Sequence, residues 1–265
     1  MNSTKQDPIG IFDSGIGGTS IWKEIHLLMP NENTIYLADS KHAPYGQKHK
    51  EDIIELSIKN TELLLEKNCK IIVVACNTAT TNAIKILRKK YSVPFIGIEP
   101  AIKPASIITK TNTIGILATK GTLNSELFAK TSNTLNTEIK IIEQIGEGLV
   151  PLIENGKIDS QEMESLLKKH LKIFIDNNVD SLVLGCTHYP YLIPKIKKII
   201  GSEMTIIDSG EAVANQTKRI LALNNTLAEK KQLALHQFFI NTNTKVLTQI
   251  LNTKHNNIEV NKLGF

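Results

Sequence analysis

Short apolar runs alternate with longer stretches of helical spacing along the first part of the chain. Strands that alternate with helices of about 10–15 residues are typical of βαβ units, which build parallel sheets. A polar loop at 39–48 interrupts this alternation once. The predicted strands are 9–12, 34–38, 70–75 and 94–98, and the predicted helices between them are 19–29, 51–66 and 78–90.

The pattern restarts in the second part of the chain. The run 114–117 (Ile-Gly-Ile-Leu) repeats the run 9–12 (Ile-Gly-Ile-Phe), and a small polar turn and a predicted helix follow each. Any two α/β stretches have such features in common, but the repeat favours two similar α/β domains that face each other. We expect mostly parallel sheets, a first domain of residues 1–99 plus 209–265, a second domain of residues 100–208, and an active site in the cleft between them.

Two cysteines stand at the ends of matching apolar runs. Cys76 follows the run 71–74, and Cys186 follows the run 182–184. Continuous apolar runs are typical of fully buried parallel strands, and open α/β sheets bind ligands beyond the carboxyl ends of their strands. We therefore expect the two thiols to face one substrate from opposite sides. That geometry suits the removal of a proton from one face of a carbon and its replacement on the other.

A thiol is a suitable proton carrier for this chemistry. Its reference pKa of about 8.5 lies near the working pH, and a nearby cation or helix amino terminus lowers that pKa. Both cysteines precede residues that are expected to open helices, where the helix dipole supplies partial positive charge. Asn77, Thr78 and Thr187, together with neighbouring backbone N–H groups, are candidate donors to a substrate carboxylate.

Asp13 and Ser14 lie between the first predicted strand and the glycine-rich segment 15–18. Glycines there would let the backbone approach a ligand closely. The segment is not a dinucleotide-binding fingerprint, because Ser20 stands where that motif requires glycine, and it lacks the lysine of a P-loop. We expect Asp13 to accept a hydrogen bond from an amino group or to steer a thiol proton, roles that are compatible with capping the next helix.

Three further regions hold candidate site residues. His188, two residues after Cys186, could tune that thiol or carry its proton. Tyr45 and Gly46 in the polar loop suit a substrate clamp, although a plain turn fits the same residues. Glu154 follows an apolar run and is either a site residue or a surface carboxylate. Packing or surface roles are expected for Cys69 and for the other histidines, which are His26, His42, His49, His170, His236 and His255.

Composition and charge narrow the classes of function. The chain has 265 residues, a net charge of +5, one Trp and five Tyr. It has no block of like charges and no interleaving of aromatic and basic residues, so nucleic-acid binding is not expected. Its three cysteines form no CxxC pair and no metal-ligand spacing, which indicates a reducing compartment and no metal site. Without an apolar targeting segment or a membrane-spanning run, we expect a cytoplasmic protein with no membrane partner.

Five segments resemble the glutamate racemases of the aspartate/glutamate racemase superfamily. They are 10–18, 43–46, 74–79, 184–190 and 207–211, and the resemblance covers essentially the whole chain. It implies two α/β domains with the active site between them, and a homodimer. It also implies cofactor-independent racemisation of L-glutamate to D-glutamate for peptidoglycan biosynthesis. The histidine after the second Cys-Thr pair favours glutamate over aspartate.

The resemblance implies roles for individual residues. Cys76 and Cys186 match the two acid/base thiols. Asp13, Glu154 and His188 match polar residues that assist the thiols. The positions that match substrate contacts are Asp13, Ser14, Tyr45, Gly46, Asn77, Thr78, Thr187 and His188. Neither a cofactor nor a metal is implied.

The residues alone leave three alternatives open. The first is a related racemase that acts on aspartate or a hydantoin. The second is a thiol redox protein that pairs Cys76 with Cys186, although redox pairs are often closer in sequence. The third is a non-catalytic module that binds small carboxylates.

Overall fold

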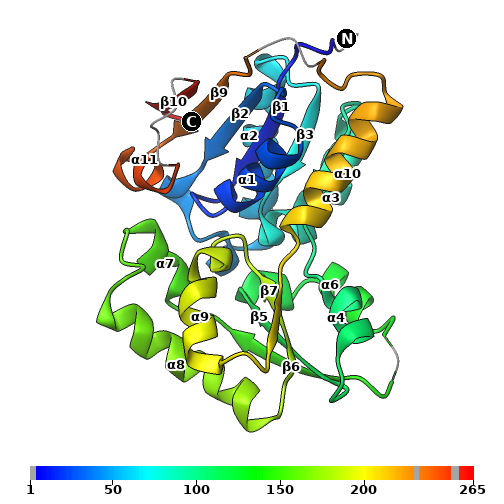
Figure 1. Ribbon diagram of the computed structural model, residues 1–265. Helices are drawn as coiled ribbons and strands as arrows, with labels where there is room; N and C mark the ends of the chain where they lie inside the picture. Colours follow the sequence, from blue (N-terminus) through cyan, green and yellow to red (C-terminus); the bar gives the residue numbers. More distant parts are fainter. Residues whose placement is uncertain (1–3, 136, 230–232, 252–256) are drawn as a thin grey trace.

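Two parallel β-sheets, each covered by helices, form the upper and lower halves of the molecule in Figure 1. The computed structural model describes residues 4–135, 137–229, 233–251 and 257–265. Every strand pairing within these residues is parallel. The expected α/β class with two mostly parallel sheets is therefore confirmed.

The first sheet has six strands in the order β10-β9-β2-β1-β3-β4. Helices α1 and α10 pack on one of its faces, and α2 and α3 pack on the other. The strands are β1 (Ile9–Asp13), β2 (Thr34–Ala38), β3 (Ile71–Val74), β4 (Phe95–Gly97), β9 (His236–Ile240) and β10 (Ile258–Lys262). The helices are α1 (Thr19–Leu28), α2 (Lys50–Glu66), α3 (Asn77–Lys90), α10 (Gly210–Leu223) and α11 (Lys245–Leu251), with short 3₁₀ turns η1 (Ser40–His42) and η2 (Tyr45–Gln47).

The second sheet has four strands in the order β6-β5-β7-β8. Helices α8 and α9 cover one of its faces, and α4 and α6 cover the other. The strands are β5 (Thr113–Ala118), β6 (Lys140–Ile145), β7 (Ser181–Gly185) and β8 (Thr205–Ile207). The helices are α4 (Ile102–Ile108), α5 (Lys120–Leu123), α6 (Glu126–Ser132), α7 (Leu149–Glu154), α8 (Gln161–Asp176) and α9 (Ile193–Ile200), with the 3₁₀ turn η3 (Tyr189–Leu192).

The two sheets repeat one topology, since β2-β1-β3-β4 and β6-β5-β7-β8 have the same order. Gly10 of β1 lies beside Ile72 of β3, and Gly115 of β5 lies beside Leu182 of β7. Cys76 and Cys186 each stand four positions beyond those partners (72 + 4 and 182 + 4). The two thiols therefore occupy the same place in the two halves.

The chain crosses between the halves twice, after β4 and after β8. The two crossings are tied together, because the Ser209 hydroxyl donates a hydrogen bond to the Glu99 carbonyl at 2.6 Å. After the second crossing, the chain adds β9 to the first sheet by pairing it with β2. None of the helices in the described part of the chain combines the length and the apolar character needed to cross a membrane.

One local expectation was wrong. Cys76 directly precedes an α-helix, but Cys186 is followed by the 3₁₀ turn η3 and only then by α9. Pro190 and Pro194 explain the difference, because a proline lacks the backbone N–H that an α-helical hydrogen bond needs beyond the first turn. The two thiols consequently have different backbone surroundings.

Cys69 belongs to the core, as expected. It is 4% exposed and packs against Gly10, where an added Cβ would lie 2.9 Å from the Cys69 sulfur. Burial raises the pKa of Cys69 to about 12, so this thiol stays protonated and unreactive.

A buried ion pair ties several segments together at the amino-terminal ends of the strands in the first sheet. Lys70 Nζ lies 2.6 Å from Glu32 Oε2, and their side chains are 0% and 2% exposed. Lys70 also donates to the carbonyls of Lys5 and Thr226, and Glu32 accepts from the N–H of Ala228. The pair has the additional hydrogen bonds that a buried ion pair requires.

Replacing Lys70 with Met is expected to lower the free energy of unfolding by about 3–5 kcal/mol, because Glu32 would keep a buried charge without its counter-ion. Urea denaturation followed by circular dichroism measures this loss. Lys172→Met is the control, since Lys172 and its partner Asp176 are 72% and 52% exposed, and a much smaller loss is expected. Equal losses of the free energy of unfolding in the two variants would contradict the expectation that burial makes the Lys70–Glu32 pair the more costly one to break.

Candidate active site

Both predicted thiols border one small cavity between the two sheets. The cavity is narrow, with a volume of about 10 Å³, and it lies where the carboxyl ends of β1 and β3 face the carboxyl end of β7. Each sheet therefore presents one cysteine to the same enclosed space. The cavity is lined by Ser14, Pro44, Tyr45, Gly46, Cys76, Asn77, Thr78, Thr119, Val150, Cys186, Thr187 and His188.

Two predicted site residues, Asp13 and Glu154, lie behind the lining instead of in it. Asp13 accepts a 3.4 Å hydrogen bond from the hydroxyl of Ser14, which lines the cavity. Glu154 pairs with His188, which also lines it. Both carboxylates can therefore act on the cavity only through a neighbour.

Three lining residues were not among the predicted site residues: Pro44, Thr119 and Val150. The internal repeat held a signal for one of them. Thr119 follows the run 114–117 at the same distance as Ser14 follows the run 9–12. Pro44 and Val150 have no comparable signal, because the sequence does not distinguish an apolar residue that lines a cavity from an apolar residue elsewhere in the fold.

Cys76 is the N-cap residue of α3, and its sulfur accepts a 3.4 Å hydrogen bond from the N–H of Ala79. Its thiol donates toward the Ser14 hydroxyl, with the two atoms 3.7 Å apart. Burial, and after it the charge of Asp13, raise the pKa of Cys76 well above its usual value. Cys76 is therefore a neutral thiol when the cavity holds no substrate.

Asp13 ends β1 and is fully buried. Its Oδ2 accepts a 2.7 Å hydrogen bond from the N–H of Gly18, which occupies the N-cap position of α1. Thr187 approaches the same oxygen from the second half, with its hydroxyl at 3.5 Å. Burial raises the pKa of Asp13 to about 6, against the opposing effect of His188, so this carboxyl can change protonation near neutral pH.

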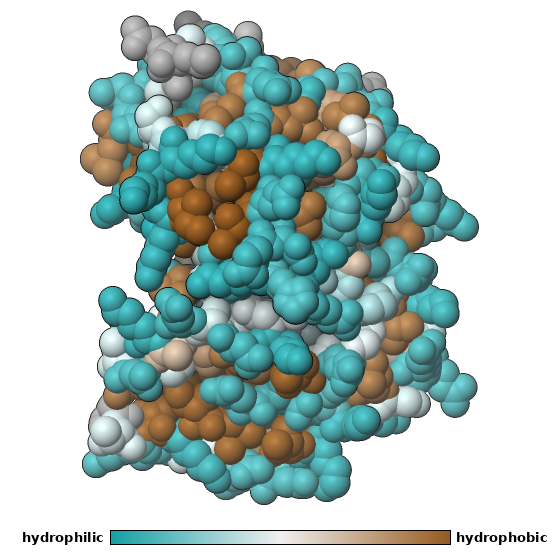
Figure 2. Space-filling view, turned by 180° about the vertical axis from the view of Figure 1, so that it is seen from behind, coloured by the Kyte–Doolittle hydropathy of each residue, from teal (hydrophilic) through white to brown (hydrophobic). Residues whose placement is uncertain are grey.

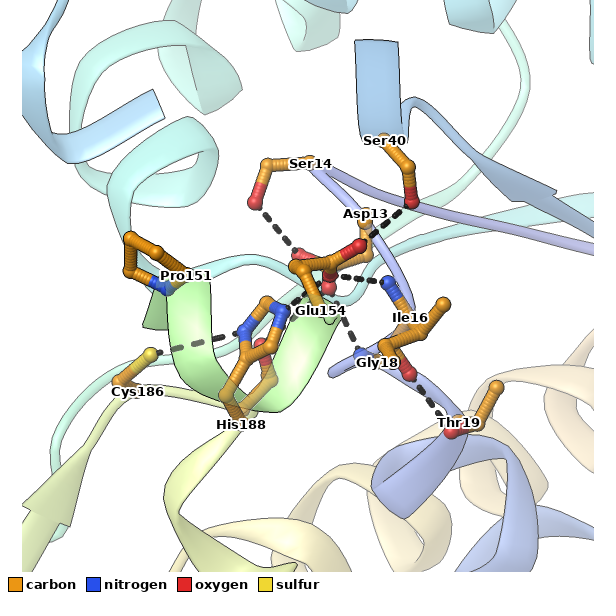
Figure 3. Close-up of polar contacts among 12 residues, drawn as sticks. Asp13, Ser14, Ile16, Gly18, Thr19, Ser40, Pro151, Glu154, Cys186 and His188 are labelled. Atoms are coloured by element: carbon orange, nitrogen blue, oxygen red, sulfur yellow. Dashed lines mark hydrogen bonds and ion pairs between the residues drawn. The ribbon is translucent and has the colours of Figure 1, made fainter. Parts of the chain in front are cut away.

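His188 lies between Glu154 and Cys186 (Figure 3). Its Nε2 is 2.6 Å from Glu154 Oε1, and its Nδ1 is 3.8 Å from the Cys186 sulfur. Burial favours the neutral ring, but the hydrogen bonds and charges of Cys186 and Glu154 outweigh it and raise the pKa of His188 well above its usual value. An imidazolium beside a cysteine is the arrangement that supports a thiolate.

Glu154 is the last residue of α7, and its carboxylate is held mainly by the first half of the molecule. The N–H of Ile16 donates to Oε1 at 2.7 Å, and the hydroxyl of Ser40 donates to Oε2 at 2.7 Å (Figure 3). Burial opposes ionisation, yet these bonds and the bond from His188 lower the pKa of Glu154 below its usual value. Glu154 is therefore a charged partner for His188.

The glycine-rich segment makes room for the side chains of Glu154 and His188. A Cβ added at Gly15 would lie 2.0 Å from Glu154 Oε1, and one added at Gly17 would lie 2.2 Å from His188 Nδ1. Any larger residue at either position would displace the ion pair. The backbone of the segment thus approaches the second half of the molecule.

Asn77 offers unused hydrogen-bonding capacity to the cavity. Both polar atoms of its side chain are buried and have no hydrogen-bond partner among the described residues. Buried polar atoms are nearly always paired, so an unpaired amide that lines a cavity indicates a site for a polar ligand. Asn77 also opens α3, where the first N–H groups favour an anion.

Contacts between the halves close one wall of the cavity. The hydroxyls of Thr78 and Thr119 are 2.8 Å apart, and they come from α3 and from the turn after β5. A Cβ at Gly46 would lie 2.8 Å from the Cβ of Thr119, so glycine is needed for this approach. The wall separates the cavity from an outer cleft. Four residues line both spaces: Pro44, Gly46, Thr119 and Val150.

The outer cleft carries positive charge. Lys48, Lys50 and Lys120 line it, together with one acidic residue, Glu147. A cleft of one dominant sign raises the local concentration of an oppositely charged substrate. Among the described residues, no group of three or more His, Cys, Asp or Glu side chains is arranged to hold a metal ion.

The other histidines in the described part of the chain lie away from the cavity lining. His42 bonds to Asp39, His170 bonds to Gln144 and to the Glu147 carbonyl, and His236 bonds to Thr34. His26 stacks on the ring of Trp22, and His49 lines the outer cleft. His255 lies outside the described residues.

The chain resembles known proteins in sequence and in fold. Residues 19–217 match the model of the Asp/Glu/hydantoin racemase family. A glutamate racemase from Ralstonia pickettii is 46% identical over 84% of this chain and 79% of its own length. The structure of a glutamate racemase from Bacillus anthracis superposes with a TM-score of 0.87 at 32% identity, over 98% of both chains.

A second solved structure is that of the glutamate racemase from Francisella tularensis in complex with D-glutamate. It superposes with a TM-score of 0.83 at 30% identity, over 97% of this chain and 98% of that chain. The match to the family model extends over most of the sequence and includes Cys76 and Cys186. This chain therefore belongs to the Asp/Glu/hydantoin racemase family.

Proposed function

We propose that the chain is a glutamate racemase that interconverts L- and D-glutamate with two cysteines and without a cofactor. One observation carries the proposal: Cys76 and Cys186, at equivalent positions of the two sheets, border the same cavity. Relatives at 41–46% identity are glutamate racemases, which supports glutamate as the substrate. The lysines of the outer cleft suit an anionic amino acid.

In one direction, the Cys186 thiolate removes the α-proton from one face of the substrate. The electron pair of the broken C–H bond stays on the α-carbon and its carboxylate, and the Cys76 thiol then donates its proton to the opposite face. The bond from carbon to hydrogen is thereby broken on one side and formed on the other. Afterwards Cys186 is a thiol and Cys76 is a thiolate, which is the state required for the reverse direction.

Each thiol has its own proton partner. The His188 imidazolium, paired with Glu154, stabilises the thiolate of Cys186. In the direction that starts from a Cys76 thiolate, Asp13, bonded to Ser14 beside Cys76, takes up the Cys76 proton while the His188 imidazolium gives one to Cys186. After turnover, Asp13 releases its proton to solvent and His188 regains one. The pKa of Asp13, about 6, suits this exchange, because a proton carrier works best when its pKa lies near the working pH.

The carboxylate beside the α-carbon gains negative charge in the transition state, and donors must already be in place for it. Asn77 supplies an amide without another partner, and Thr187 and the first N–H groups of α3 supply further donors. Because the cavity is enclosed, little water competes with these donors. The repeated topology fits a reaction whose two directions are chemically equivalent.

Purified protein is expected to convert either enantiomer of glutamate to the racemic mixture with no added cofactor. Circular dichroism of the solution, started from D-glutamate and then from L-glutamate, follows the reaction. In deuterated water, the product of inverted configuration should carry deuterium at the α-position. Parallel assays with aspartate and a hydantoin test the related substrates, and faster turnover of either one would contradict glutamate as the substrate.

Cys76→Ala and Cys186→Ala are each expected to abolish net racemisation, because either variant lacks the acid or the base on one face. Cys69→Ala is the matched control, since this thiol lies in the core and outside the cavity lining, and near-normal turnover is expected. Chiral chromatography measures turnover, and far-UV circular dichroism checks the folding of all three variants. Wild-type turnover in either cavity variant would contradict the two-cysteine mechanism.

The value of kcat/KM is expected to fall as the pH drops through about 6, because protonated Asp13 can no longer accept the Cys76 proton. Below that pH the fall should approach about tenfold per pH unit. It should be the same from L- and D-glutamate, because enantiomers have equal free energy. Asp13→Asn should lack this acid limb as well as most activity. Initial rates across about pH 5–9 test the expectation, and a flat wild-type profile would contradict it.

We infer further that the enzyme is a cytoplasmic homodimer that supplies D-glutamate for peptidoglycan. The resemblance to glutamate racemases supports the metabolic role, and three free cysteines fit a reducing compartment. Figure 2 shows apolar residues gathered in patches on both halves of one face. On the opposite face, Leu27 and Leu223, on the packed helices α1 and α10, are 73% and 67% exposed. Exposed apolar side chains of this kind support pairing with a second chain.

A further inference from the structure

The segment Pro44–Gly46 forms part of the cavity wall, although it belongs to neither sheet. Tyr45 is 1% exposed and lines the cavity, and its two neighbours line both the cavity and the outer cleft. Tyr45 and Gly46 begin the single 3₁₀ turn η2, which has few backbone hydrogen bonds of its own. Its position must therefore come from side-chain contacts.

The Tyr45 side chain is anchored at its hydroxyl. This hydroxyl donates a 2.6 Å hydrogen bond to Asp39 Oδ2 and accepts a 3.1 Å bond from the Asn60 amide of α2. Burial, and after it the charge of Asp39, raise the pKa of Tyr45 well above its usual value, so the hydroxyl remains a donor. Hydrogen bonds from a neutral donor to a carboxylate are among the stronger ones in proteins.

Asp39 is itself fixed from several sides. It follows β2, is 2% exposed, and its N–H donates to the carbonyl of Asp13 at 3.1 Å. Its Oδ1 accepts from His42 Nδ1 at 2.6 Å and from the Asn241 amide at 2.5 Å. Asn241 lies just beyond β9, so Asp39 links the ends of three neighbouring strands to the wall.

We propose that Asp39 is a positioning residue for racemisation, which it serves by holding Tyr45 and thereby the Pro44–Gly46 wall against the substrate. The proposal rests on the proposed function. Asp39 does not line the cavity, so it acts through Tyr45. The wall must be placed accurately, because it packs so closely against Thr119 that a Cβ at Gly46 would not fit.

The expected effect is a change in KM with little change in kcat. A loosened wall weakens its contacts with substrate and with transition state alike, because it touches parts of the substrate away from the α-carbon. Loss of such uniform binding raises KM and leaves kcat nearly unchanged. A residue that only stabilised the fold would lower the melting temperature and leave KM as it was.

The test compares Asp39→Asn, Tyr45→Phe and the double variant with the wild type, with KM and kcat measured for both enantiomers of glutamate. Each single variant is expected to raise KM about tenfold, which is the loss of one hydrogen bond to a charged group. The double variant should be no worse than the poorer single variant, because both changes remove the same bond. Tyr45→Phe deletes only a hydroxyl, so it decides the question even if Asp39→Asn fails to fold.

Asp180→Asn is the matched control. The Asp180 carboxylate also accepts three hydrogen bonds, from the Thr109 hydroxyl and the N–H groups of Lys110 and Thr111, but it lies outside the cavity lining. This variant should lower the melting temperature without raising KM.

Two outcomes would overturn the proposal: an unchanged KM in Tyr45→Phe, even where KM rises in Asp39→Asn, or additive effects in the double variant. These outcomes apply when the wild-type protein racemises glutamate. Wild-type protein that does not racemise glutamate would instead refute the proposed function.

Discussion

The arrangement of the site depends on a buried ion pair that neither half of the molecule completes alone. His188 and Glu154 both come from the second half, but the Ile16 N–H and the Ser40 hydroxyl that complete the carboxylate's hydrogen bonds come from the first. A buried pair is tolerated only when its remaining hydrogen-bonding positions are filled. Contact between the halves therefore sets up the charge beside Cys186 and also encloses the cavity that both thiols border.

A repeated scaffold carries two different sets of proton partners. Asp13 is the last residue of β1, and the equivalent last residue of β5 is Ala118. His188 stands two positions after Cys186, where the first half has Thr78 after Cys76. One thiol thus has a carboxyl neighbour and the other an imidazolium. The proposed chemistry needs this difference, because one cysteine must start as a base and the other as an acid.

The sequence predicted most strands, because buried parallel strands are short and continuously apolar. It also placed both cysteines at strand ends, and the strand register puts them at equivalent positions. The sequence did not predict which residues of the two halves contact each other. The partners of Gly15 and Gly17, and the bond between Ser40 and Glu154, join residues more than a hundred positions apart that share no pattern.

The site prediction was limited in the same way. Asn77 was a candidate from its place after a strand, but its unpaired amide becomes visible only when the whole cavity is assembled. The sequence places Asp39 only in a polar loop, because no local pattern shows that this residue bonds to Tyr45, His42 and Asn241. Polar residues that act through others leave no periodic signal.

The clearance at Gly15 and Gly17 has a consequence for how such a chain can evolve. These two positions accommodate Glu154 and His188, so the glycine loop and the distant acidic and imidazole groups must change together or not at all. A chimaera that joined the first half of this chain to the second half of a distant relative would assemble only if the incoming side chains fitted the same two gaps. Shape matching between the halves thus restricts recombination within the family, independently of any demand from the substrate.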